Sequence, residues 1–130
     1  MMTVPVTDKT RSYRLFVLIS TSVPALIFVQ VVLAGLSLYY DGSLLEVHKA
    51  LGMLIALPII SMMVLALHDG EPRVNLSRTL ILLVLYCVQV ALMVIGRETG
   101  SGFLPALHVP NAFVMGAFSD FTARQARKHP

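Results

Sequence analysis

The chain is organised as four long apolar blocks separated by short polar stretches. The blocks cover residues 13–40, 44–67, 76–96 and 103–121. A helix rises about 1.5 Å per residue, so about 20 residues cross the hydrocarbon core of a bilayer. Each block approaches or exceeds that length, and each is too uniformly apolar to form one face of a soluble bundle. The pattern predicts an all-α fold, a polytopic membrane four-helix bundle that forms a single transmembrane domain over residues 1–130.

Charged residues are few and unevenly placed. They make up 13% of the chain, against roughly 25% of a soluble globular domain. Most cations lie before the first block, between the second and third, and after the fourth: Lys9, Arg11, Arg14, Arg73, Arg78, Arg124, Arg127 and Lys128. The positive-inside rule therefore predicts a multi-pass protein of the inner (cytoplasmic) membrane of the cell, with both termini in the cytoplasm. This asymmetry accounts for the pI of about 9.4, so we expect the lipid bilayer as a partner and no nucleic acid.

The second half of the chain repeats the first, with two-helix units over residues 13–67 and 76–123. In each unit a glutamine is followed 18 or 19 positions later by a histidine: Gln30 and His48, then Gln89 and His108. Small residues stand four and eight positions after each histidine: Gly52 and Ala56, then Ala112 and Gly116. On a helix these positions lie on one face. Each histidine therefore stands over a strip without side-chain bulk, which suits a flat ligand slotted between two helices.

The two histidines are expected at equal depth, a few residues inside the outer ends of the second and fourth blocks. Because these blocks run in the same direction, the imidazoles should face each other across the bundle. Ionisable residues inside a membrane are functional-site candidates, and two opposed imidazoles suit the axial positions of a b-type haem. We therefore predict His48 and His108 as metal ligands of haem b. The alternative for each histidine is a hydrogen bond to a neighbouring helix.

The repeated pattern of glutamine, loop and histidine resembles that of a known family. A glutamine, a short polar loop and a span that opens with histidine and a small residue four later, repeated once, resemble one four-helix half of haem A synthase. In that family a half holds one haem between histidines of its second and fourth helices, which implies His48 and His108 as axial ligands. The chain departs from the family at Leu45, where the family has a catalytic glutamate, and Glu46 is displaced by one. The resemblance implies a small haem-binding bundle, and a homodimer would mimic the two halves of the family.

Other residues near the predicted site have two interpretations each. Lys49 and Arg97 are the cations of the outer side, and they either pair with haem propionates or snorkel to the interface. Gln30 and Gln89 either join helices by hydrogen bonds or support a ligand histidine. Pro110 lacks an N–H, so we expect an interruption of the helix after His108. His68 and His129 are expected to be surface residues.

Three functions remain open from the sequence. Closed axial positions disfavour oxygen binding, so a haem here points to electron transfer, with a quinol or a redox protein as partner; whether the protein is an enzyme stays open. An accessory or assembly subunit of a membrane complex would use the histidines only as hydrogen-bonding groups. A small four-span transporter is the third alternative. Exporters of that type have a buried glutamate in the first span and a tryptophan, whereas this first block has no acidic residue and the chain has no Trp.

Overall fold

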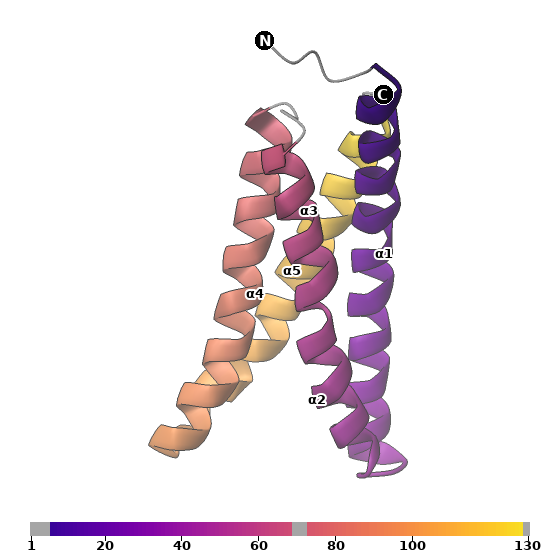
Figure 1. Ribbon diagram of the computed structural model, residues 1–130. Helices are drawn as coiled ribbons and strands as arrows, with labels where there is room; N and C mark the ends of the chain where they lie inside the picture. The colour runs from indigo at the N-terminus through magenta and orange to yellow at the C-terminus, as the bar shows by residue number, and fades with distance from the viewer. Residues whose placement is uncertain (1–5, 69–72, 129–130) are drawn as a thin grey trace.

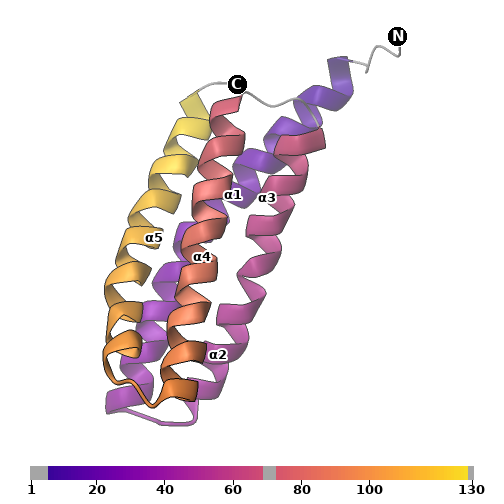
Figure 2. The same ribbon diagram turned by 90° about the vertical axis from the view of Figure 1, so that its left-hand side faces the viewer.

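The computed structural model describes residues 6–68 and 73–128, and this part of the chain is helical, with short connections and no strand. Its helices run along one bundle axis (Figures 1 and 2) and are α1 (Val6–Tyr39), α2 (Leu44–Leu54), α3 (Ala56–His68), α4 (Arg73–Thr99) and α5 (Phe103–Lys128). The all-α prediction is confirmed. Each predicted block lies, to within one residue at its ends, inside one helix or inside the α2–α3 pair.

Three helical stretches among the described residues are long and apolar enough to cross a membrane: Arg11–Tyr39, Leu44–Leu67 and Val74–Thr99. They indicate a membrane protein. Helix α5 has 26 residues, but it is not among these candidates. The helix is long enough to cross a membrane, but polar residues such as His108, Asn111 and Asp120 lower its mean hydropathy.

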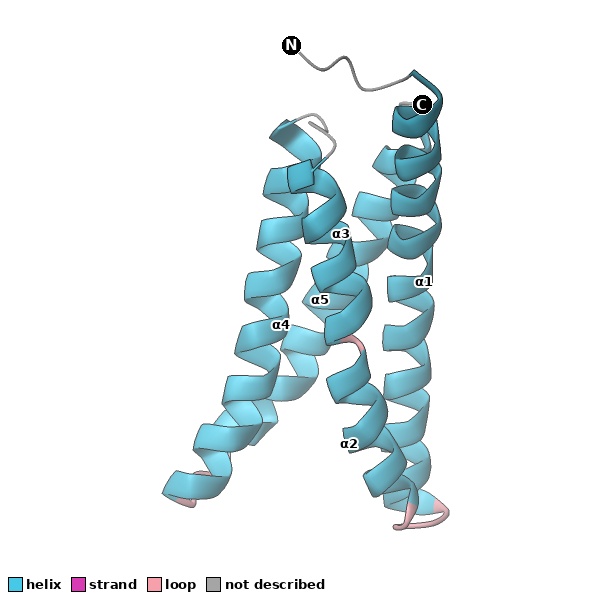
Figure 3. Cartoon of the chain, viewed as in Figure 1, coloured by secondary structure: helices cyan, strands magenta, loops and turns pink. Residues whose placement is uncertain are grey.

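The second apolar stretch is broken once, at Ile55, where α2 ends and α3 begins (Figure 3). Pro58 follows three residues later. Its ring lacks an N–H and collides with the carbonyl four residues earlier, that of Leu54, so a regular helix is disfavoured at this turn. Pro58 therefore accounts for the interruption at Ile55.

The expected interruption at Pro110 is wrong. Helix α5 continues through this residue from Phe103 to Lys128. Proline removes only one backbone hydrogen bond, the one to the carbonyl of Ala106. The next residue, Asn111, donates its side-chain amide to the main-chain carbonyl of Leu85 on α4, and this bond holds the turn in place.

The half of the bundle where α1 begins and α5 ends is closely packed. Helix α1 packs against α3 and α5, and α4 packs against the same two helices. Small hydroxyl residues are fully buried there and donate to carbonyls of their own helices: Ser20, Thr79, Ser119 and Thr122. Small side chains at helix interfaces let backbones approach closely in a membrane.

The opposite half is more open. Helix α2 has no buried residue and packs against α1 and α3, while the ends of α4 and α5 diverge from it (Figures 1 and 2). Helix α4 ends in a Schellman motif, in which Gly100 has φ 66° and the N–H of Ser101 reaches the carbonyl of Gly96. Gly96 also lets α5 approach, because a Cβ there would lie 2.5 Å from Cδ of Pro105.

Candidate functional site

The two histidines singled out by the repeat lie beside each other in the open half. His48 stands in the second turn of α2 and His108 in the second turn of α5. Their ring centroids are 6.3 Å apart, and the ring planes make an angle of 67°. Both side chains are half-buried. Residues 60 positions apart in the sequence thus present two imidazoles to the same small volume.

Each imidazole is held through the same atom. Nδ1 of His48 lies 3.1 Å from the main-chain carbonyl of Gln30, and Nδ1 of His108 lies 3.0 Å from that of Gln89. A carbonyl only accepts hydrogen bonds, so each Nδ1 carries the proton and donates it. Each Nε2 then has a free lone pair, and within the described residues neither Nε2 has a hydrogen-bond partner.

In the first predicted unit, the side chain of Gln30 also forms a hydrogen bond with His48. Nε2 of Gln30 donates to the main-chain carbonyl of His48 at 2.9 Å, so the two residues clamp α1 to α2. Gly52 makes room for this amide, because a Cβ there would lie 3.5 Å from Nε2 of Gln30. The Gln30 side chain is only 8% exposed, and its Oε1 has no partner among the described groups.

In the second predicted unit, the side-chain oxygen of the glutamine has a hydrogen-bond partner. Oε1 of Gln89 accepts a 2.6 Å hydrogen bond from Nδ2 of Asn111, which also donates to the carbonyl of Leu85 at 3.1 Å. Asn111 stands three residues after His108, and the matching residue of the first unit is Leu51. The apolar Leu51 cannot donate, which explains why Oε1 of Gln30 is left without a partner.

Two residues of this site were missed by sequence reasoning. Asn111 had one usable signal, since it is an amide in an apolar stretch, one helical turn after a candidate ligand. Tyr86 had none. It is buried on α4, and its hydroxyl donates to the carbonyl of Gly52, 3.1 Å away, and lies 3.4 Å from that of Met53. Tyr86 therefore links α4 to α2 just before the break at Ile55.

The small residues of the predicted strips lie in different surroundings. Gly52 faces the amide of Gln30, and a Cβ at Gly116 would lie 3.4 Å from Cγ2 of Ile27. Both glycines therefore give room to α1. Ala56 and Ala112 are half-buried. Contact of these strips with a ligand stays a prediction.

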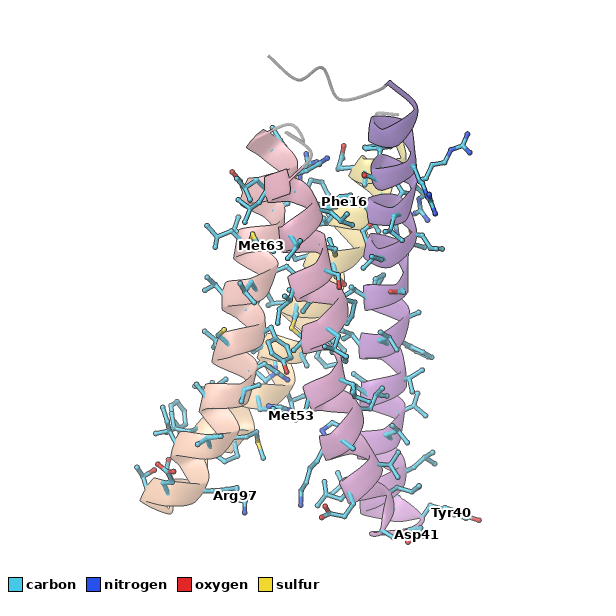
Figure 4. All side chains as sticks on the ribbon, viewed as in Figure 1. Phe16, Tyr40, Asp41, Met53, Met63 and Arg97 are labelled. Carbon is cyan, nitrogen blue, oxygen red and sulfur yellow. The ribbon has the colours of Figure 1, made fainter. Side chains whose placement is uncertain are left out.

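The two cations predicted for the outer side, Lys49 and Arg97, lie in the more open half of the bundle. Nζ of Lys49 forms a 2.6 Å ion pair with Oε1 of Glu46, and both side chains are exposed. Arg97 lines a hollow of about 380 Å³ together with Val94 and Glu98. Figure 4 shows Arg97 directed from the end of α4 toward α2. Arg97 therefore places a cation on the side of α4 that faces α2 (Figure 4).

Within the described residues, the potential metal ligands that lie close together here are His48 and His108. No three His, Cys, Asp or Glu side chains in residues 6–68 and 73–128 are placed to hold a metal ion together. Protein ligands alone would thus give two-coordination, whereas metal sites such as zinc sites use three or four protein ligands. His129 and the side chain of His68 lie outside the described residues.

Comparison with known proteins gives one match. A family model described as a family of unknown function (DUF6220) matches residues 30–97. The matched segment contains Gln30, His48 and Gln89, and it ends before His108. No curated protein and no solved structure matches the chain.

Proposed function

This chain belongs to the DUF6220 family, and we propose that it is a membrane electron-transfer protein that holds one b-type haem between His48 and His108. The observation that carries the proposal is the placement of two imidazoles, each with Nδ1 bonded to a carbonyl and Nε2 free, at a centroid distance of 6.3 Å. The electron donor or acceptor is a quinol or a redox protein. The family's unknown function neither favours nor opposes this assignment.

The distance between the rings fits two axial ligands. A histidine nitrogen lies about 2 Å from a bound metal, and the centre of an imidazole lies about 1.2 Å beyond that nitrogen, given ring bonds near 1.33 Å. Two axial histidines on one metal therefore place their ring centres about 6.4 Å apart. The observed 6.3 Å agrees with this value and supports the proposal that the two residues would hold the group.

The hydrogen bonds around the rings are those expected of ligands. A metal-ligating histidine usually donates its other ring N–H to a carbonyl or carboxylate, which selects the tautomer and orients the ring. Gln30 and Gln89 serve this purpose through their main chains. When bound, the haem would supply one-electron chemistry. The chain orients both imidazoles and holds a proton on each Nδ1, and the two histidines would hold the group.

The topology proposed for this function has four spans and two repeated units. Helix α5 packs along α1 and α4, and its polar residues His108 and Asn111 are bonded to α4. These groups lower its hydropathy without facing lipid, so we propose that α5 crosses with the others. The shared Nδ1–carbonyl contact supports the repeat. The cations at the end where α1 begins and α5 ends support cytoplasmic termini in the inner membrane.

The outer cations complete the proposal. Haem propionates are anionic, and Arg97 and Lys49 lie at the open end of the bundle, where they would pair with carboxylates. Lys49 would have to leave Glu46, an exposed contact worth at most about 1 kcal/mol. Gly52, Ala56, Ala112 and Gly116 remain the predicted helix surfaces beside the ring.

The test is the absorption spectrum of the detergent-purified chain, oxidised and dithionite-reduced, after expression with ample haem. We expect sharp α and β bands on reduction, which weaken or become high-spin in His48→Ala and His108→Ala. His68→Ala is the matched control, since it removes a histidine outside the site. A colourless wild-type protein, or equal effects of all three substitutions, would refute the haem assignment.

One observation favours a second candidate, an accessory subunit without haem. The reciprocal bonds between Gln30 and His48 are sufficient reason for a histidine in a helix interface, since they join α1 to α2. This candidate predicts a colourless protein that is stable only with its complex. A small transporter has no such support. A homodimer is a separate proposal, and a strictly monomeric mass by light scattering would count against it.

A further inference from the structure

A second hollow lies at the opposite end of the bundle from the histidines. It has a volume of about 250 Å³ and is lined by Tyr13, Arg14, Val17 and Arg127. The walls come from α1 and α5, which pack against each other. Two guanidinium groups from opposite ends of the sequence thus border one small space with an apolar floor.

The position of these arginines is set by the packing beneath them. The hydroxyl of Tyr13 donates to the main-chain carbonyl of Ala126, and Phe16 and Ala126 are buried between the helices. Arg14 follows Tyr13 and Arg127 follows Ala126 in the sequence. The hydrogen bond between their neighbours therefore keeps the two cations at the same level of the bundle.

Two other arginines at this end have partners, whereas no carboxylate pairs with Arg14 or Arg127 in the part of the chain that the structure describes. Arg124 forms a 2.5 Å ion pair with Asp120, which raises the pKa of its guanidinium, and Arg78 lies 5.4 Å from the ring centroid of Phe121. Within the described residues, the hollow therefore carries two positive charges without a paired carboxylate.

We propose that this hollow binds the phosphate group of an anionic phospholipid. Arg14 lies three residues inside the candidate span Arg11–Tyr39, which is the depth of headgroups. Paired guanidiniums bind phosphate oxygens in a bidentate manner, and Val17 and the ring of Tyr13 offer apolar contact to the glycerol and the first acyl carbons. The proposal rests on the membrane location of α1 and is independent of the haem.

The test compares two double substitutions that remove the same charge. Arg14→Gln with Arg127→Gln removes the proposed site, and Arg11→Gln with Arg124→Gln is the matched control on the same two helices. The full chain in a neutral detergent is titrated with phosphatidylglycerol or phosphatidylcholine, and bound lipid is counted by native mass spectrometry. A cation near an anionic membrane surface contributes about fivefold in affinity, so we expect phosphatidylglycerol binding to fall about 25-fold in the site variant and to stay within a few-fold of wild type in the control.

Three results would overturn the proposal. An equal loss of phosphatidylglycerol binding in both double variants would show that general surface charge attracts the lipid. Binding of phosphatidylcholine as tight as that of phosphatidylglycerol would show that the headgroup charge is irrelevant. Displacement of the lipid by millimolar inorganic phosphate would assign the site to a soluble phosphate. Arg14→Lys with Arg127→Lys guards against misfolding, because it keeps the charge and loses only the bidentate geometry. We expect this variant to retain wild-type helix content and an intermediate affinity.

Discussion

Leu51 and Asn111 each lie about one helical turn after a site histidine, and only Asn111 can donate a hydrogen bond to the glutamine nearby. Exchanging the two residue types tests this difference between the two sides of the site. In Asn111→Leu, the second unit receives the residue that the first unit has at position 51. The substitution removes two hydrogen bonds, of 2.6 Å to Oε1 of Gln89 and of 3.1 Å to the carbonyl of Leu85. It also leaves that oxygen without a donor on a side chain that is 8% exposed.

The expected loss follows from these contacts. A hydrogen bond between membrane helices contributes about 0.6 kcal/mol on average and up to about 1.7 kcal/mol, and an unpaired buried oxygen adds a further penalty. We expect Asn111→Leu to lower the free energy of unfolding by about 1–2 kcal/mol. The reverse change, Leu51→Asn, should raise it by about 0.5–1 kcal/mol, because the new amide can donate to Oε1 of Gln30.

The assay is reversible unfolding of the detergent-solubilised chain in increasing dodecyl sulfate, followed by circular dichroism. The sign of the Leu51→Asn effect is decisive, because an amide that finds no acceptor on a half-buried helix face destabilises a membrane protein. A neutral Asn111→Leu, or a destabilising Leu51→Asn, would refute the equivalence of the two positions. Opposite signs of the predicted size would support the two-unit architecture.

Three further substitutions test other contacts of the site. Tyr86→Phe removes the bond from α4 to the carbonyls of α2 and should lower the unfolding free energy by about 0.6–1.7 kcal/mol in the same assay; no change would mean that the contact contributes nothing. Gly96→Ala places a Cβ 2.5 Å from Cδ of Pro105 and should cost about 1–3 kcal/mol, whereas Gly35→Ala, with nothing within 4 Å, serves as its control and should not destabilise. Arg97→Gln should speed the transfer of haem to apomyoglobin several-fold if this cation pairs with a propionate, and an unchanged rate would exclude that role.

The helices were predictable from the sequence because each long apolar block became helical. The four blocks matched the helix bounds closely, and the expectation that His48 and His108 lie opposite each other agrees with ring centroids 6.3 Å apart. Local proline chemistry was less reliable. Pro58 coincides with a break, but Pro110 does not, since Asn111 bonds to α4 and compensates for the lost backbone hydrogen bond.

The supporting residues were harder to predict because they depend on how the helices are rotated against each other. Gln30 and Gln89 were recognised as candidates, but the sequence does not show that their main chains, and not only their side chains, hold the histidines. The hydroxyl of Tyr86 reaches the main chain of α2 from α4. Such contacts arise from the arrangement of several helices, and no spacing within one helix predicts them.

The central claim is that both imidazoles bind one iron, and low-temperature electron paramagnetic resonance of the oxidised, haem-loaded chain tests it most directly. We expect a low-spin ferric signal that integrates to one haem per chain and that turns high-spin in both His48→Ala and His108→Ala. A high-spin signal in the wild-type protein would mean that at most one histidine binds, and the absence of any haem signal would mean that the pair is structural.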